Sequence, residues 1–307
     1  MSKVKSYLSL IKFSHTIFAM PFALIGFFLA FKTGITNSVR GSDAGKWINL
    51  NDNTLFYIGL KLFGLVILCM IFARSAAMAF NRYLDRNIDA KNPRTAIREI
   101  PKGIITATNA LAFTIISSLL FIVCTFFINK LCFYLSPVAL AVVLGYSYTK
   151  RFTPLCHLIL GLGLSLAPIG AYLAVTGQFA FLPILFSIAV IFWVSGFDII
   201  YALQDEEFDK SQQLYSIPAW LGKAKALHMS ELFHGLSASA VFIAGRYGGF
   251  GWLYWIGVAV FIGMLVYQHS VVKPNDLRRV NLAFMTANGI ASVVFAIFVI
   301  LDLFINI

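Results

Sequence analysis

Nine apolar stretches, each about 20 residues long, occupy most of this 307-residue chain. A helix of that length crosses the hydrocarbon core of a bilayer, and lipid admits only helices or closed barrels as spanning structures. The sequence therefore predicts an all-α integral membrane protein with nine transmembrane helices. We place them at residues 14–32, 55–80, 107–129, 131–149, 155–176, 181–202, 224–245, 249–270 and 280–304.

The connections between these stretches are short, so we expect residues 1–307 to form one membrane domain. Charged residues make up only 12% of the chain, about half the share that is typical of soluble domains. The first apolar stretch has no small-residue cleavage site after it. We therefore predict a retained helix there rather than a signal peptide.

Basic residues are distributed unevenly between the two sides of the predicted bundle. With the N-terminus inside, 17 of the 24 Lys and Arg residues fall on the cytoplasmic side and 5 on the other side. This positive-inside bias predicts a bacterial-type inner membrane protein with a cytoplasmic N-terminus and an external C-terminus. The bias also accounts for the net charge of +11 without a nucleic-acid partner.

Two acidic clusters follow apolar stretches at a fixed offset in the sequence. Asp85 and Asp89, in NRYLDRNID, each lie 120 residues before Asp205 and Asp209, in DEEFD. Carboxylates at i and i+4 share one face of a helix, and four crossings return the chain to the same side of the membrane. Hard oxygen ligands of this kind suit Mg²⁺, to which Asn81 would add a neutral oxygen. We predict a cytoplasmic Mg²⁺ site formed by Asn81, Asp85, Asp89, Asp205 and Asp209.

Solvated loop charges are the alternative interpretation of these carboxylates, and a single cluster would favour it. Two clusters on one side of a bilayer argue against it, because concentrated like charges there require a neutralising cation. The large polar loops beside the clusters, 81–106 and 203–223, suit a mobile cap over a site. Simple solvated connectors are the alternative for both loops.

Two ionisable residues lie deeper in the predicted helices. Asp198 precedes Asp205 by seven residues, and Arg74 precedes Asn81 by seven, so each lies about two turns below a cluster. An ionisable group at such depth indicates function by default, and a buried Arg needs an anion. Arg74 would pair either with Asp198 or with a substrate carboxylate. A structural hydrogen bond is the alternative role for Asp198.

Several residues beside the clusters suit a phosphorylated substrate. A diphosphate needs cations in addition to a metal ion, whereas the positive-inside rule alone would explain the same charges. Tyr146 and Tyr148 are either interfacial aromatics or ring faces for a developing cation. His15 is the one histidine that merits a test. We predict diphosphate contacts from Lys91, Arg94, Arg98, Lys150, Arg151 and Tyr148.

These motifs together resemble the UbiA superfamily of intramembrane prenyltransferases. NRYLDRNID resembles its NxxxDxxxD motif, and DIIYALQDEEFD resembles its second Asp motif. RTAIREIPKG resembles its RTxxRxxPxG loop, with Glu99 where many members have Pro, and GYSYTKR resembles its basic motif. The run HTIFAMPFAL is more similar to the 4-hydroxybenzoate polyprenyltransferase-like branch, including the MqnP type, than to haem O synthases.

The resemblance implies a helical bundle with a central cavity under a cytoplasmic cap. It also implies Mg²⁺-dependent transfer of a polyprenyl group from an allylic diphosphate to a small aromatic acid. That acid would be 4-hydroxybenzoate or a dihydroxynaphthoate in ubiquinone or menaquinone biosynthesis. Arg74 and Asp198 would be catalytic residues at the acceptor end. The expected partners are polyprenyl diphosphate, the aromatic acceptor and membrane lipid, with no obligatory protein partner.

Two other functions remain open on the sequence. One is transfer to a different acceptor, such as haem, a sugar phosphate or a glycerol phosphate. The other is a non-enzymatic carrier or flippase for a polyprenyl phosphate, which would need gates on both faces. The predicted ionisable groups lie on one face, which favours chemistry over transport.

The predicted topology can be tested by thiol labelling. In a cysteine-free variant, a cysteine placed within residues 210–216 should resist an impermeant thiol reagent applied to intact cells, because that loop is expected to be cytoplasmic. A cysteine placed within 40–46 should react. The reverse labelling pattern would contradict the orientation.

Overall fold

The computed structural model describes residues 3–11, 18–39 and 52–305, and these are helical apart from connections and one isolated bridge between Lys273 and Asp276. The α-helices run as follows: α1 Lys3–Leu10, α2 Met20–Val39, α3 Asp52–Lys91, α4 Ala107–Ile128, α5 Lys130–Thr149, α6 Cys156–Thr176, α7 Phe181–Ala202, α8 Glu206–Ser211, α9 Ile217–Leu221, α10 Lys223–Gly248, α11 Trp252–Val271 and α12 Asn288–Ile305. A 3-10 turn, Leu203–Asp205, follows α7, and a π-helical turn, Leu282–Ala287, precedes α12.

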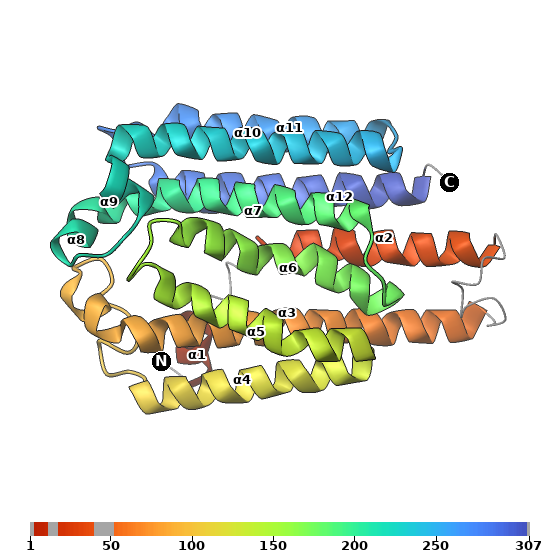
Figure 1. Cartoon of the computed structure of the whole chain (residues 1–307), viewed down its shortest axis with the longest axis horizontal. Helices are drawn as coiled ribbons and strands as arrows, with labels where there is room; N and C mark the ends of the chain where they lie inside the picture. Colours follow the sequence, from red (N-terminus) through yellow and green to blue (C-terminus); the bar gives the residue numbers. More distant parts are fainter. Residues whose placement is uncertain (1–2, 12–17, 40–51, 306–307) are drawn as a thin grey trace.

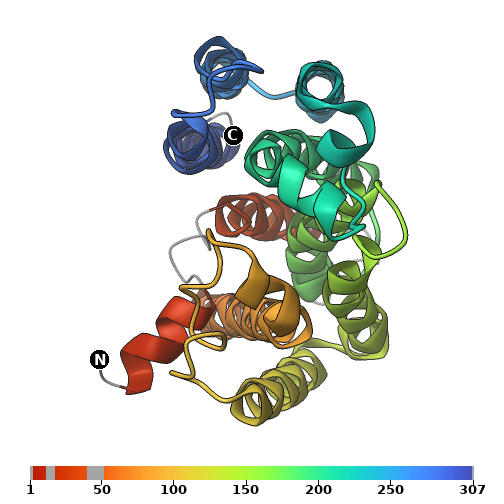
Figure 2. The same ribbon diagram turned by 90° about the vertical axis from the view of Figure 1, so that its left-hand side faces the viewer.

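The long helices lie side by side in one bundle (Figure 1). Helices α3, α4 and α5 pack on one another, α6 packs on α5 and α7, α7 packs on α10, and α11 packs on α10 and α12. Figure 2, an end-on view, shows α2 near the middle of the bundle, where it packs mainly on α6 and α12. The short helices α8 and α9 lie at one end of the bundle, and the C-terminus lies at the other (Figure 1).

Among the described residues, seven helices are long and apolar enough to cross a membrane: α3, α4, α5, α6, α7, α11 and the continuous segment Leu282–Ile305. Within such a helix the backbone N–H and C=O groups hydrogen-bond to one another, as a lipid environment requires. Helix α2 contributes a shorter apolar stretch, Met20–Thr33. Helix α10 carries Lys223, Lys225, Glu231 and Arg246. The prediction of an all-helical membrane protein is confirmed, while crossings by α2 and α10 stay predictions.

Helix α3 is much longer than the span predicted for it. The prediction ended this helix at residue 80 and placed residues 81–106 in a loop, whereas α3 continues to Lys91. The physical reason is that NRYLDRNIDAK contains no Gly or Pro and satisfies its backbone within the helix. At about 1.5 Å per residue, its 40 residues extend to roughly 60 Å, about twice the hydrocarbon thickness. The first acidic cluster therefore lies on a rigid helix.

Packing of α2 against α7, α11 and α12 is aromatic and tight. Phe22 contacts Trp193, Phe261 and Phe295, and all four side chains are buried. Tilted and edge-on ring contacts of this kind stabilise a core beyond the apolar area they bury. This packing fixes α7, and with it the start of the second acidic cluster, against the rest of the bundle.

Candidate active site

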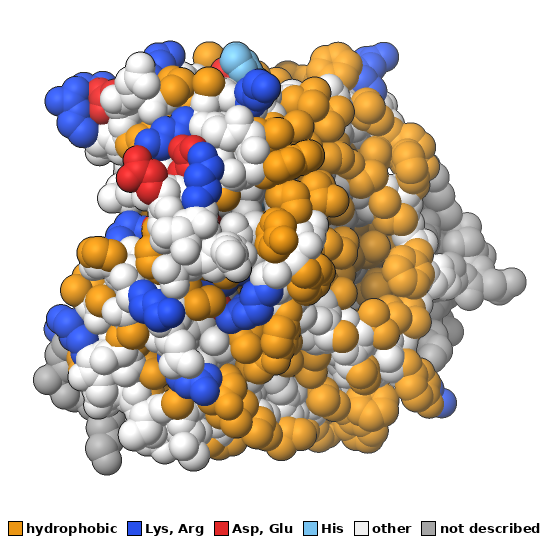
Figure 3. Space-filling view, turned by 60° about the vertical axis from the view of Figure 1, so that its left-hand side comes forward, with side chains coloured by type: hydrophobic (Ala, Val, Ile, Leu, Met, Phe, Trp, Pro, Cys, Tyr) orange, Lys and Arg blue, Asp and Glu red, His pale blue; other side chains and the backbone are white. Residues whose placement is uncertain are grey.

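A cavity of about 540 Å³ opens at the end of the bundle that carries α8 and α9. Its walls come from α3, α5, α6 and α7, and the segments after α3 and after α7 lie across it. Figure 3 shows Lys, Arg, Asp and Glu side chains gathered toward this end, whereas hydrophobic side chains cover much of the neighbouring surface. The predicted Asn81, Asp85, Asp89, Asp205 and Asp209 all line this cavity.

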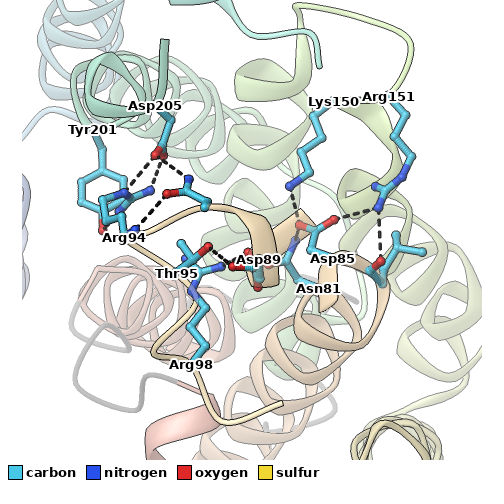
Figure 4. Close-up of polar contacts among 12 residues, drawn as sticks. Asn81, Asp85, Asp89, Arg94, Thr95, Arg98, Lys150, Arg151, Tyr201 and Asp205 are labelled. Atoms are coloured by element: carbon cyan, nitrogen blue, oxygen red, sulfur yellow. Dashed lines mark hydrogen bonds and ion pairs between the residues drawn. The ribbon is translucent and has the colours of Figure 1, made fainter. Parts of the chain in front are cut away.

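Asp85 is held by two cations at the end of α5. Its side chain is only 2% exposed, and its Oδ2 atom accepts from Lys150 Nζ at 2.5 Å. Arg151 Nη2 donates to Asp85 Oδ1 at 2.8 Å, and Asn81 Nδ2 donates to Asp85 Oδ2 at 3.2 Å. Figure 4 shows Lys150 and Arg151 reaching Asp85 from the same side. A buried carboxylate requires such partners, because removing one charge from water is costly.

Asp89, one turn further along α3, is held by the segment that follows the helix. Arg98 Nη1 donates to Asp89 Oδ1 at 2.7 Å, and Thr95 Oγ1 donates to the Asp89 carbonyl at 3.1 Å (Figure 4). The second carboxylate oxygen, Oδ2, is buried and has no hydrogen-bond partner among the described residues. An orphaned buried acceptor in a charged cavity indicates that a ligand completes it.

Asp205, in the second acidic cluster, is bonded to residues of the segment that follows the first cluster. Arg94 Nε donates to Asp205 Oδ1 at 2.9 Å, Arg94 Nη2 pairs with Oδ2, and Asn92 Nδ2 donates to Oδ1 at 3.1 Å. The Arg94 guanidinium also donates to the Tyr201 hydroxyl at 2.8 Å and lies over its ring (Figure 4). Burial alone would lower the pKa of Arg94, but Asp205 and Tyr201 raise that pKa above its usual value. Arg94 is therefore a fixed cation.

Asp209 lies apart from Asp205 on the short helix α8. Ser216 Oγ donates to Asp209 Oδ2 at 2.9 Å and also caps the N-terminus of α9 by accepting from Ala219 N. The chain changes from the 3-10 turn to α8 between the two carboxylates. The second pair therefore does not share the face of one continuous helix, although both members line the cavity.

Arg74 and Asp198 line the same cavity. Asp198 Oδ2 lies 2.7 Å from His157 Nδ1 on α6. The backbone N–H of Ile217 donates to His157 Nε2 at 3.3 Å, so Nδ1 carries the ring proton and donates to Asp198. His157 was missed by the sequence analysis because a lone histidine 41 residues before Asp198 has no motif spacing.

Some predicted diphosphate contacts lie at the margin. Lys91 is exposed and donates to Gln212, and Tyr148 is exposed and packs on Phe80. Neither lines the cavity, whereas Tyr146 does. Arg151 reaches the cavity only through Asp85. His15 lies outside the described residues.

A second cavity of about 400 Å³ begins where the first ends. Its lining is almost entirely apolar and comes mostly from α3, α4, α5 and α6. Both cavities share five lining residues, namely Arg74, Met78, Tyr146, Leu160 and Leu164. A charged chamber thus adjoins an apolar one inside the bundle, an arrangement that fits an amphiphile with an anionic head and a hydrocarbon tail.

The chemistry of the residues present fits a hard divalent cation. The four carboxylates and the one amide that were predicted as metal ligands line a single cavity, and Asp89 Oδ2 has no partner among the described residues. Carboxylate oxygens are the ligands that Mg²⁺ takes in proteins. In the described part of the chain, no three such acidic, His or Cys groups converge closely enough to hold an ion as they stand. Basic side chains neutralise Asp85, Asp89 and Asp205 instead.

The bond between Arg94 and Asp205 should contribute measurably to stability. Arg94→Ala would leave Asp205 with Asn92 alone, and hydrogen bonds to charged groups are worth about 1.5–3 kcal/mol when partly buried. We expect a lower melting temperature in detergent without added ligands. Arg278→Ala is the matched control, because the Arg278–Asp276 pair is 88% and 38% exposed and such pairs stabilise little. Equal melting temperatures for both variants would contradict this assignment.

Residues 19–290 match the UbiA prenyltransferase family. A 4-hydroxybenzoate octaprenyltransferase from Tolumonas auensis is 29% identical over 73% of this chain and 78% of its own length. A UbiA homolog from Aeropyrum pernix K1 has a similar structure, with a TM-score of 0.73, 27% identity and coverage of 95% of this chain and 98% of that one.

A more distant structure shows the same fold. A UbiA homolog from Archaeoglobus fulgidus, solved bound to DMAPP and Mg²⁺, has a TM-score of 0.69 at 19% identity and covers 98% of this chain and 99% of that one. The family match extends over most of the sequence, from the start of α2 into α12, and includes all the cavity-lining segments described above. This chain therefore belongs to the UbiA prenyltransferase family.

Proposed function

We propose that this protein transfers a polyprenyl group from an allylic diphosphate to an aromatic acid, with 4-hydroxybenzoate as the first candidate acceptor. The relative from Tolumonas auensis carries that acceptor in its name. One observation carries the proposal: a chamber lined by carboxylates and cations adjoins an apolar chamber, and Arg74 and Tyr146 belong to both. The head, the tail and the reacting carbon of a prenyl diphosphate would each find a matching environment.

The diphosphate would occupy the mouth of the first cavity. Asn81, Asp85, Asp89, Asp205 and Asp209 would hold Mg²⁺, which supplies charge neutralisation for the departing diphosphate. The basic partners of these carboxylates would then exchange a carboxylate for a phosphate oxygen. Arg94, Arg98 and Lys150 line the cavity and are positioned for this exchange. Lys91, Arg151 and Tyr148 would support the mouth from outside.

The reaction breaks the bond between C1 of the prenyl chain and the diphosphate oxygen, which leaves with the electron pair. The resulting allylic cation is attacked by an electron-rich carbon of the acceptor ring, and that carbon then loses its proton to restore aromaticity. Cations at the mouth stabilise the negative charge that develops on the leaving group. The apolar chamber excludes water, which would otherwise capture the cation.

Arg74 and Asp198 would bind the acceptor on the deep side of the first cavity. The Arg74 guanidinium suits a carboxylate, because its planar fork makes two parallel hydrogen bonds. His157 holds one oxygen of Asp198, which keeps this carboxylate oriented toward the cavity. Asp198 would accept the hydrogen bond of the phenol and so make the ring more electron-rich.

The orientation in the membrane follows from the same geometry. The bundle end with α8 and α9 would face the cytoplasm, as the excess of basic residues there favours. Helices α2 and α10 would complete nine spans in one membrane domain of a bacterial-type inner membrane. The segments 92–106 and 203–222 would form the cap, since both contribute to the cavity lining.

Transfer can be measured with lipid-reconstituted protein, Mg²⁺, an allylic diphosphate and a panel of aromatic acids, using mass spectrometry of the products. We expect prenylated 4-hydroxybenzoate, no product in chelator, and recovery when Mg²⁺ is restored. Asp85→Asn should abolish product formation in a folded protein, because one hard ligand is lost. Product from a different acceptor alone would change the proposed substrate, and turnover in chelator would contradict the metal site.

The acceptor site can be tested separately at Arg74. Arg74→Ala should lower kcat/KM for the aromatic acid by roughly 30-fold or more, since breaking a desolvated charge pair is costly. Arg74→Lys should rescue only partly, because a point charge cannot form the fork. Acceptors without a carboxylate should be poor substrates, and the mutation should change their kcat/KM very little. Equal use of such acceptors by the wild type would assign Arg74 to a partner within the protein.

A further inference from the structure

Arg82 is a buried cation that neither the sequence motifs nor the proposed reaction has yet used. It follows Asn81 on α3, is 5% exposed, and lines the charged cavity. Its Nε atom has no hydrogen-bond partner among the described residues. None of the ion pairs formed by these residues involves Arg82. A guanidinium in such a position is costly unless an anion neutralises it.

Each neighbouring carboxylate is bonded to another group through one oxygen, and none hydrogen-bonds to Arg82, although Asp89 Oδ2 has no partner among the described residues. Asp89 and Glu99 are the negative electrostatic neighbours of Arg82, and Arg98 is a positive one. Asp89 pairs with Arg98 at 2.7 Å, and Glu99 accepts a hydrogen bond from Ser9. The other cations on the cavity wall near this level, such as Arg94 and Lys150, each have a carboxylate partner. Arg82 therefore has spare donor capacity that faces the cavity.

The position of Arg82 along α3 indicates which of the two substrate anions, the acceptor carboxylate or the diphosphate, it would bind. Arg82 lies between Asn81 and Asp85, at the level of the carboxylates that suit Mg²⁺, and two turns from Arg74. An acceptor carboxylate bound by Arg74 would lie at the deeper level, whereas the diphosphate would lie at the level of Arg82. Arginine binds phosphate oxygens in a bidentate manner, which uses donors that are free here.

We infer that Arg82 is a further diphosphate-binding residue. It binds the head group from the side of the cavity where Asp89 lies, opposite Lys150 and Arg151. This inference rests on the proposed function and adds a specific contact to it. Because inorganic diphosphate carries the head group without the tail, its binding should depend on Arg82 even when no transfer can occur.

The test is the affinity of lipid-nanodisc protein for inorganic diphosphate with Mg²⁺, measured by calorimetry. We expect Arg82→Gln to weaken binding by about 30-fold or more, because a desolvated cation is lost. Arg86→Gln is the matched control. Arg86 lies one turn further along α3, donates to the Tyr83 carbonyl and does not line the cavity, so its replacement should leave affinity unchanged.

Unchanged diphosphate affinity in a folded Arg82→Gln variant would overturn the inference, as would a loss confined to the KM of the aromatic acid. If Arg82→Gln does not fold, Arg82→Lys decides: weaker binding by about tenfold supports a bidentate contact, and wild-type affinity overturns it. A wild type that binds diphosphate tightly but transfers no prenyl group would contradict the proposed function and leave the role of Arg82 standing.

Discussion

The structure depends on one electrostatic constraint, which is the cost of holding several carboxylates at the edge of an apolar bundle. Asp85 and Asp89 are 2% and 4% exposed, and isolated charges at such positions would be unstable. Each is therefore paired with a cation from a different segment: Lys150 and Arg151 directly follow α5, and Arg98 follows α3. The need to neutralise these carboxylates thus connects α3 to the end of α5, 65 residues away, and to the segment that follows α3. In the proposed function, a metal ion would neutralise these carboxylates while the diphosphate would pair with their basic partners, so each group would keep an opposite charge beside it.

Helix α3 supplies the order in which the substrates would lie. Arg74, Asn81, Arg82, Asp85 and Asp89 all line one cavity, and an α-helix separates Arg74 from Asn81 by roughly 10 Å along its axis. An acceptor anion at the deep end and a diphosphate at the mouth would therefore be kept apart, with Tyr146 between the two levels. Tyr146 is an electrostatic neighbour of both Arg74 and Arg82. The apolar chamber begins at this level, where the carbon that changes partners would lie.

Much of the fold was predictable because hydrophobic length is a direct consequence of bilayer thickness. The bounds of α4, α6 and α7 differ from the predicted spans by at most one residue at each end. The predicted end of α3 was wrong, because hydropathy indicates where a helix leaves the lipid and not where the helix itself ends. Within the site, paired spacing selected four carboxylates that all line one cavity, and their role as metal ligands stays a prediction. His157 and Arg82 were not identified, because the positions of their partners depend on tertiary packing and leave no periodic signal. Tyr148 and Lys91 were chosen by sequence proximity, which does not determine the direction of a side chain.

The most direct test of the exchange between internal cations and a metal–diphosphate pair is Mn²⁺ retention by nanodisc protein in equilibrium dialysis, read by electron paramagnetic resonance. Linkage requires that each ligand raise the affinity for the other by the same factor. We expect little Mn²⁺ retained alone, markedly more with inorganic diphosphate, and loss of that gain in both Asp85→Asn and Asp205→Asn. Equal retention with and without diphosphate, or full retention in the two variants, would contradict the assignment of these carboxylates to a metal–diphosphate site.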